Sequence, residues 1–259
     1  MWPEFRDHCR ERDVVFFATP TSFSALEELV RLGAPLLKNG SDYLLHIPLI
    51  EAMAGTGIPT ILSTGMATYD EIDAAVQSFR AAGGTDLILL HCTSTYPAPA
   101  VDVHLRKIGA LRESFGCLVG FSDHTDGIVA ALGAVALGAC FVEKHFTLDR
   151  SLPGPDHRFS SDPAQLAELV DAIRQIEASL GTAAIGPTTS ELVGRRDYRL
   201  SCVAARELFP GEILVPEDVV FRRPGSGVSP GELPLLIGRA LRRRVPPGTV
   251  LAQSDLEPR

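Results

Sequence analysis

An alternation of short apolar runs with amphipathic segments constrains this chain more than any other feature. Each run is almost continuously hydrophobic and turns polar only at its last positions, as in "LILLHCT" and "CLVGFSDH". Runs of this kind occupy residues 14–20, 35–41, 59–65, 87–93, 117–124 and 140–146. They are typical of parallel strands that are buried on both faces. The sequence therefore predicts a parallel sheet of the α/β class.

The segments after these runs have the apolar spacing of helices, at i, i+3 and i+4, and many end in glycine. They occupy residues 22–33, 46–57, 68–84, 101–116, 126–139 and 162–181. Run and segment together repeat as a βα unit. The pattern predicts six such units, ending near Gly181.

The polar residues of every unit gather at the C-terminal end of the predicted strand. A (β/α)8 barrel has its active site there, because the βα loops converge on that face. Six units are two fewer than eight, so two architectures stay open. The sheet is either an open, doubly wound one, or a TIM-type (β/α)8 barrel that lacks its first two βα units. An uncovered six-stranded barrel would expose two apolar edges, which soluble proteins avoid.

The composition changes after residue 181. Residues 182–194 predict a linker between a partial barrel domain at 1–181 and a second domain at 195–259. Proline, glycine and arginine are frequent in this last part, and the apolar runs are short. We expect a small, loop-rich and mostly β domain there.

Net charge and cysteine content limit the classes of partner and the cell compartment that we expect for this chain. The 259 residues carry a net charge of −8, which argues against nucleic acid or a membrane surface as the partner, since both bind clustered Lys and Arg. No apolar stretch reaches the roughly 18 residues of a membrane span. Five cysteines without close pairing give no disulfide framework. We therefore expect a cytoplasmic protein that binds small molecules.

Two histidines follow neighbouring predicted strands. Side chains two apart on a strand share a face, so Glu143 and His145 point the same way, and His124 ends the preceding strand. Two imidazoles near carboxylates suit Mn, Fe or Zn, and oxygen-rich surroundings favour Mn²⁺ or Mg²⁺. Alternatively, each histidine is a hydrogen-bonded core residue.

A second set of polar residues at strand ends consists of hydroxyls and one lysine. Its members are Thr19, Lys38, Ser41, Ser63, Ser94 and Ser122. Such groups bind phosphate or carboxylate, because they donate hydrogen bonds without adding a negative charge. The alternative is helix capping, which "STGMATYDE" and "TSFSALEE" also fit.

A cysteine and an arginine pair can each be explained without a role in a functional site. Cys92 lies inside an apolar run, which favours a buried structural thiol over a nucleophile. Arg222 and Arg223 precede a proline turn, where an arginine pair is either a solvated surface or a clamp on a substrate.

Taken together, the motifs "ILSTGMAT", "LLHCTSTYPAP", "VGFSDHTDGI", "AVALGACFVEKHFTLDRSLPGPDH" and "RRPGSGVSP" resemble the sialic acid synthase family. That family comprises N-acetylneuraminate synthases and their legionaminate and pseudaminate relatives. The resemblance covers nearly the whole chain. It implies a (β/α)8 barrel followed by an antifreeze-like (SAF) domain, in a domain-swapped homodimer whose tails each cover the partner's barrel.

The resemblance also implies an activity. The family condenses phosphoenolpyruvate with an N-acetylated aldose such as N-acetylmannosamine and releases phosphate. A divalent metal, commonly Mn²⁺, with Mg²⁺ or Co²⁺ as alternatives, polarises the aldehyde, and carbon 3 of phosphoenolpyruvate attacks it. Water then adds to the oxocarbenium carbon, and the tetrahedral intermediate loses phosphate by C–O cleavage.

Site roles follow from the same resemblance. His124 and His145 match the metal ligands, and Arg223 matches a tail arginine that reaches the N-acetyl group of the sugar in the partner's site. Residues that match the lining of the metal and sugar site are Glu143, Tyr96 and Asp156. Residues that match the phosphoenolpyruvate site are Thr19, Lys38, Ser41, Ser63, Ser94 and Ser122.

Departures from the family pattern leave other functions open. Family members begin with two further βα units, which carry a glutamate and a second lysine, so we expect this chain to be an N-terminally shortened member. Asn39 stands where an apolar residue is usual, and Ser94 and Thr95 where an asparagine is common. The alternatives are a non-catalytic homologue that binds metal and sugar, and another phosphoenolpyruvate-using aldolase, against which the SAF-like tail speaks.

Overall fold

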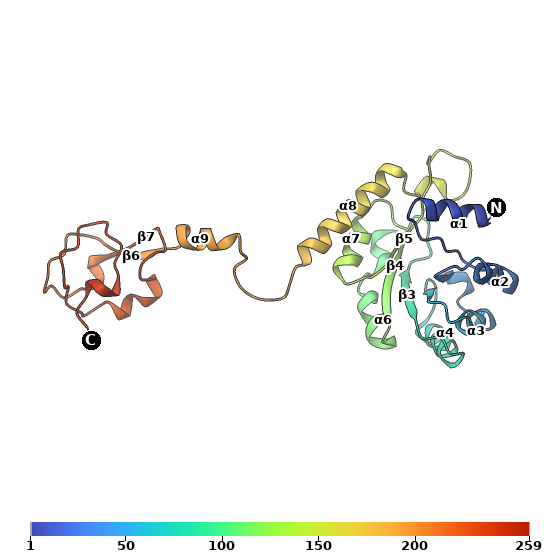
Figure 1. Cartoon of the computed structure of the whole chain (residues 1–259), viewed down its shortest axis with the longest axis horizontal. Helices are drawn as coiled ribbons and strands as arrows, with labels where there is room; N and C mark the ends of the chain where they lie inside the picture. The colour runs from blue at the N-terminus through green and yellow to red at the C-terminus, as the bar shows by residue number, and fades with distance from the viewer. Residues whose placement is uncertain (1, 259) are drawn as a thin grey trace. The chain divides into compact units, whose positions relative to one another are not determined.

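A computed structural model describes residues 2–258 of the chain. It divides into two compact units, Met1–Gly181 and Thr182–Arg259 (Figure 1). None of the helices within residues 2–258 combines the length and the apolar character that crossing a bilayer requires.

A parallel sheet forms the centre of the first unit (Figure 1). Within residues 2–258 its strands pair in sequence order, from β1 to β5, and the sheet curls like half of a barrel. The strands are β1 (Leu37–Asn39), β2 (Thr60–Ser63), β3 (Leu87–Cys92), β4 (Leu118–Asp123) and β5 (Val142–Lys144). The prediction of a parallel α/β sheet is confirmed, and each of these strands lies in a predicted run.

The run at 14–20 differs from the expectation. It does not form a full strand, and its pairing within the described residues is a single parallel bridge between Ala18 and Leu37. Val14 and Val15 are exposed. Because no strand of the described chain lies on the outer side of this segment, its backbone groups have nothing to pair with there.

Helices connect the strands as predicted, with one interruption. Those of the first unit are α1 (Trp2–Glu11), α2 (Phe23–Arg31), α3 (Ile47–Gly55), α4 (Tyr69–Ala81), α5 (Ala100–Val103), α6 (Lys107–Phe115), α7 (Val129–Ala136) and α8 (Pro163–Leu180). The segment predicted as one helix at 101–116 divides at His104, whose φ of 48° is left-handed and ends α5. Helix α1 was not predicted.

Local capping explains where two of these helices begin. The Thr68 hydroxyl accepts a hydrogen bond from the backbone N–H of Glu71, and the Glu71 carboxylate accepts one from the backbone N–H of Thr68, so a capping box starts α4. Asp162 and Gln165 start α8 in the same way. In "STGMATYDE" the cap is therefore Thr68, and Ser63 lies at the end of β2, free for another role.

The sheet has one face for the core and one for polar groups. Helices α3, α4 and α6 pack on the face that carries Leu62, Leu89 and Phe121, all of which are almost completely buried. Side chains alternate along a strand, so residues one position away from these point to the opposite face. That face holds the polar residues described below.

The second unit combines a helix, a small antiparallel sheet and several tight turns. Helix α9 (Glu191–Tyr198) lies partly in the segment predicted as a linker, where Glu191 accepts hydrogen bonds from the N–H and hydroxyl of Thr188. Strand β6 (Ser201–Ala204) pairs with β7 (Val219–Arg222). Short 3-10 turns at Pro216–Asp218, Pro230–Leu235 and Gln253–Asp255 surround them. Regular β structure is thus sparser than predicted, because isolated bridges replace longer strands.

The packing predicts that two leucines of the sheet contribute differently to the free energy of unfolding. Leu89 in β3 is fully buried and Leu118 in β4 is 60% exposed. We expect Leu89→Ala to lower the free energy of unfolding by about 2–5 kcal/mol, because it leaves a cavity in the core. Leu118→Ala should change it by about 0.5 kcal/mol or less. Urea denaturation followed by circular dichroism measures both, and equal losses would contradict the assigned faces of the sheet.

Candidate active site at the carboxyl edge of the sheet

A row of side chains crosses the sheet close to the carboxyl ends of its strands. Cys92 of β3 lies opposite Ser122 of β4, and Ser122 lies opposite Glu143 of β5. Lys38 of β1 lies opposite Ile61, two residues before Ser63. Residues paired in this way point to the same face, so the five polar residues share the face opposite the helices.

Lys38 is the buried cation of this row. Its Nζ donates to Oγ of Ser63 at 2.8 Å and to the carbonyl of Asn39 at 3.0 Å. Nζ also lies 3.4 Å from Oε2 of Glu143, and Oγ of Ser122 donates to Oε1 of Glu143 at 2.7 Å. The Glu143 carboxylate is thereby held between a cation and a hydroxyl.

Next to Lys38, the loop after β2 forms a cradle around Gly65. The N–H of Gly65 donates to Oγ of Ser41 at 3.0 Å. A Cβ on Gly65 would lie 2.2 Å from Oγ of Ser94, 2.7 Å from Oγ of Ser41 and 3.1 Å from Sγ of Cys92. Only glycine fits, because any side chain would displace the two hydroxyls. A lysine, several hydroxyls and a glycine backbone are the groups that bind a phosphate or carboxylate.

Two histidines face each other beyond the row. The rings of His124 and His145 have centroids 5.2 Å apart and lie edge to face. Tyr96 packs on both, with centroid distances of 4.2 Å to His124 and 5.7 Å to His145. Phe159 closes the cluster at 5.4 Å from Tyr96 and 5.2 Å from His145. The aromatic rings leave few orientations open to the imidazoles.

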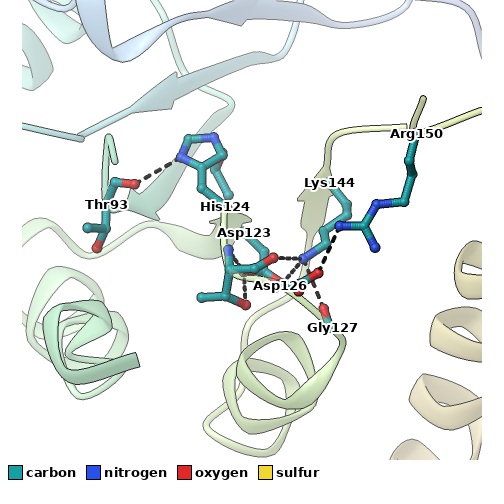
Figure 2. A network of polar contacts seen from close by, with 9 residues as sticks. Thr93, Asp123, His124, Asp126, Gly127, Lys144 and Arg150 are labelled. Carbon is teal, nitrogen blue, oxygen red and sulfur yellow. Dashed lines mark hydrogen bonds and ion pairs between the residues drawn. The ribbon is translucent and has the colours of Figure 1, made fainter. Parts of the chain in front are cut away.

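Hydrogen bonding fixes which nitrogen of His124 is available. Its Nδ1 lies 2.9 Å from the carbonyl oxygen of Thr93, which can only accept, so Nδ1 carries a proton and, in the neutral ring, Nε2 carries the lone pair (Figure 2). Burial opposes protonation of the ring, but hydrogen bonds with Cys92 and with the Thr93 carbonyl outweigh it and raise the pKa of His124.

The pKa of His145 is instead lowered. Burial and then the neighbouring His124 lower its pKa, although Asp156 raises it. Nδ1 of His145 lies 3.8 Å from Oδ2 of the exposed Asp156. A neutral His145 keeps a lone pair that a metal ion can use.

The donor set fits an open metal site. Among residues 2–258, no three His, Cys, Asp or Glu side chains are close enough together to enclose a metal ion. His124 has a backbone carbonyl behind its Nδ1, the arrangement that orients metal-bound histidines. Two imidazoles could hold a divalent ion whose other ligands come from water or substrate oxygens.

Within the first unit most of the predicted site residues come together, and Thr19 does not. Thr19 is exposed, follows the bridge residue Ala18, and makes no hydrogen bond within the described part of the chain. Arg223 belongs to the second unit, where its guanidinium carbon lies 5.4 Å from the ring centroid of Tyr198. Their predicted roles rest on the family resemblance.

The sequence interpretation overlooked three members of the cluster. Cys92 is buried as expected, but its Sγ also lies 3.8 Å from Nδ1 of His124 and from Oγ of Ser94. Strand alternation could have revealed this, because Cys92 lies two positions after Leu90 on β3, and both point to the face opposite the helices. Gly65 and Phe159 gave no comparable signal, since each is brought in by a loop.

Fold and site together define an α/β protein whose polar side chains gather where its parallel strands end. The model of the NeuB family matches residues 1–184, and that of the SAF domain matches residues 201–257. The chain therefore belongs to the NeuB family.

Several named relatives are synthases of nonulosonic acids. The chain is 38% identical to an N,N'-diacetyllegionaminic acid synthase of Legionella pneumophila over 94% of its own length and 70% of the relative's. It is 35% identical to a pseudaminic acid synthase of Helicobacter pylori, over 98% and 75%. A crystal structure of an N-acetylneuraminic acid synthetase from Leptospira borgpetersenii, in complex with citrate, matches with a TM-score of 0.70 and 37% identity, over 74% of this chain and 67% of that one.

The cradle gives a direct test of anion binding. Gly65→Ala should weaken the binding of inorganic phosphate at least about tenfold, because its methyl group would push Ser41 and Ser94 apart. Gly55→Ala is the matched control, since a Cβ there meets nothing within 4 Å. Isothermal titration with phosphate gives both affinities. Equal affinities would remove Gly65 from the site.

Proposed function

We propose that this chain is a nonulosonic acid synthase that condenses phosphoenolpyruvate with an N-acetylated sugar. The observation that carries the proposal is the anion cluster of Lys38, Ser63 and the Gly65 cradle beside two facing histidines. Membership of the NeuB family, whose named relatives make legionaminic and pseudaminic acids, supports the same reaction.

Phosphoenolpyruvate is assigned to the cluster around Lys38. Its phosphate and carboxylate need donors, which the Lys38 ammonium and the hydroxyls of Ser41 and Ser94 provide. Glu143 is the one carboxylate in this row, and Lys38 and Ser122 already bond to it. It is therefore oriented without repelling the ligand strongly, and it lies between the anion cluster and His124.

The sugar is assigned to the side of the histidines. Tyr96 and the exposed Asp156 border this region, where the aldehyde end can approach His124 and His145. A divalent metal, Mn²⁺ in this proposal with Mg²⁺ or Co²⁺ as alternatives, would supply Lewis-acid polarisation of the aldehyde when bound there. The two imidazoles would hold that ion, and the Tyr96 and Phe159 rings pack against them.

The complete enzyme is proposed to be larger in two respects. The curled sheet would belong to a (β/α)8 barrel completed by two further βα units, which bring a glutamate and a second lysine. The family resemblance also leads us to propose a homodimer, in which Arg223 of one copy contacts the N-acetyl group of the sugar bound by the other. We also propose that the enzyme is cytoplasmic.

The proposal is tested by phosphate release from phosphoenolpyruvate. The 259-residue chain, and a version extended by two N-terminal βα units, are assayed with Mn²⁺ and either N-acetylmannosamine or a diacetylated hexose. We expect release that depends on the sugar and is abolished by EDTA. His145→Ala should lower kcat at least about a hundredfold and also remove bound metal, because Lewis-acid assistance contributes several kcal/mol.

Two outcomes would contradict it. If His145→Ala keeps the metal content of the wild type, His145 is not a ligand. If neither version releases phosphate with any N-acetylated hexose while metal still binds, the chain is instead a non-catalytic module that binds metal and sugar.

A further inference from the structure

A buried ion pair lies on the side of the sheet opposite the site. Lys144 of β5 and Asp123 of β4 point toward the helices, and their side chains are 5% and 0% exposed. Nζ of Lys144 lies 2.9 Å from Oδ2 of Asp123 (Figure 2). Each residue is followed directly by a site histidine, Asp123 by His124 and Lys144 by His145.

All three donors of the Lys144 ammonium are used. Besides Asp123, Nζ donates to the carbonyl oxygen of Thr125 at 2.5 Å. It also donates to the carbonyl oxygen of Gly127 at 3.0 Å (Figure 2). Asp123 uses its other oxygen, Oδ1, to accept from both the N–H and the hydroxyl of Thr125, each at 2.8 Å. The Lys144 ammonium thus binds the side chain of the residue before His124 and the backbone of the segment after it.

The same contacts fix His145. Successive side chains on a strand point to opposite faces of the sheet. Because Lys144 points to the helix-covered face, its neighbours Glu143 and His145 point to the face that carries the site. Because one ammonium binds the end of β4 and lies on β5, the spacing between the two imidazoles depends on it. The hydrogen bond from Nδ1 of His124 to Thr93 then sets the rotation of that ring.

The network continues into the loop that carries Asp156. Arg150 lies in this loop, and its Nη2 is 3.4 Å from Oδ1 of Asp126, next to Gly127 (Figure 2). Nε of Arg150 donates at 3.0 Å to the carbonyl of Arg158. The loop beside His145 is therefore tied to the segment that Lys144 holds.

A buried ion pair is a poor source of net stability, because desolvation offsets the attraction between its charges. Stability alone therefore gives little reason for a lysine and an aspartate at this position. Geometry gives a better one, since the pair joins two strands whose next residues must face each other at a fixed distance.

We propose that Lys144 and Asp123 are positioning residues that set the distance and direction of the His124 and His145 imidazoles for a divalent metal. This inference rests on the proposed function only in that a metal ion binds between the two histidines. Neither residue touches the ligand; both act through the backbone of the histidines they precede.

The test measures Mn²⁺ binding to the substrate-free full chain by electron paramagnetic resonance, which reports the free ion. Lys144→Met should weaken Mn²⁺ binding about tenfold to a hundredfold, the usual effect of losing an outer partner of metal ligands. It also leaves the buried Asp123 carboxylate unpaired, which is destabilising. The double variant Asp123→Asn/Lys144→Met avoids this, because the amide oxygen can still accept from Thr125, and we expect the same weakening. Circular dichroism verifies that each variant is folded.

The matched control is Arg206→Met in the second unit, which removes the partner of the buried Asp218. It should lower stability and leave Mn²⁺ affinity unchanged.

His124→Ala should abolish Mn²⁺ binding. If the wild type binds no Mn²⁺, the metal part of the proposed function fails and this inference with it. If the wild type binds but both Lys144 variants bind within twofold of it, only the inference is overturned. Failure of both variants to fold would assign the pair to stability and overturn it as well.

Discussion

The parallel pairing of β4 with its neighbours is the constraint on which the site depends. It places Ser122 between Cys92 and Glu143 in one transverse row. A shift of one residue in the register of β4 would turn Ser122 into the helix-packed core and Phe121 toward the ligand. Burial of Leu89 and Phe121 against the helices therefore fixes the site as firmly as the polar contacts themselves.

The two faces of the sheet divide the chemistry between them. The inner face carries the lysine, the hydroxyls and the acid that suit a charged substrate, and the outer face carries the apolar core. Asp123 and Lys144 are charged and yet buried on the outer face. In the proposed positioning role, the place of this pair directly before both histidines accounts for the charge on that face.

Much of the fold could be predicted because hydrophobic periodicity is a local property. The strands from β1 to β5 and the helices between them follow from apolar runs, and Thr68 and Asp162 are recognisable caps. The failures are residues whose state depends on distant partners. Residues 14–20 have the composition of a strand but pair only at Ala18, and the predicted helix at 101–116 breaks where His104 adopts a left-handed backbone.

The sequence by itself determined the family, the parallel α/β class and the set of polar residues at the strand ends, since each is written in order and spacing along the chain. Only the tertiary structure decided that the Gly65 cradle closes around Ser41 and Ser94, that Cys92 contacts His124, and that Lys144 binds the loop after β4. These contacts join residues far apart in sequence. They arise from the curl of the sheet and the paths of its loops, which no local pattern encodes.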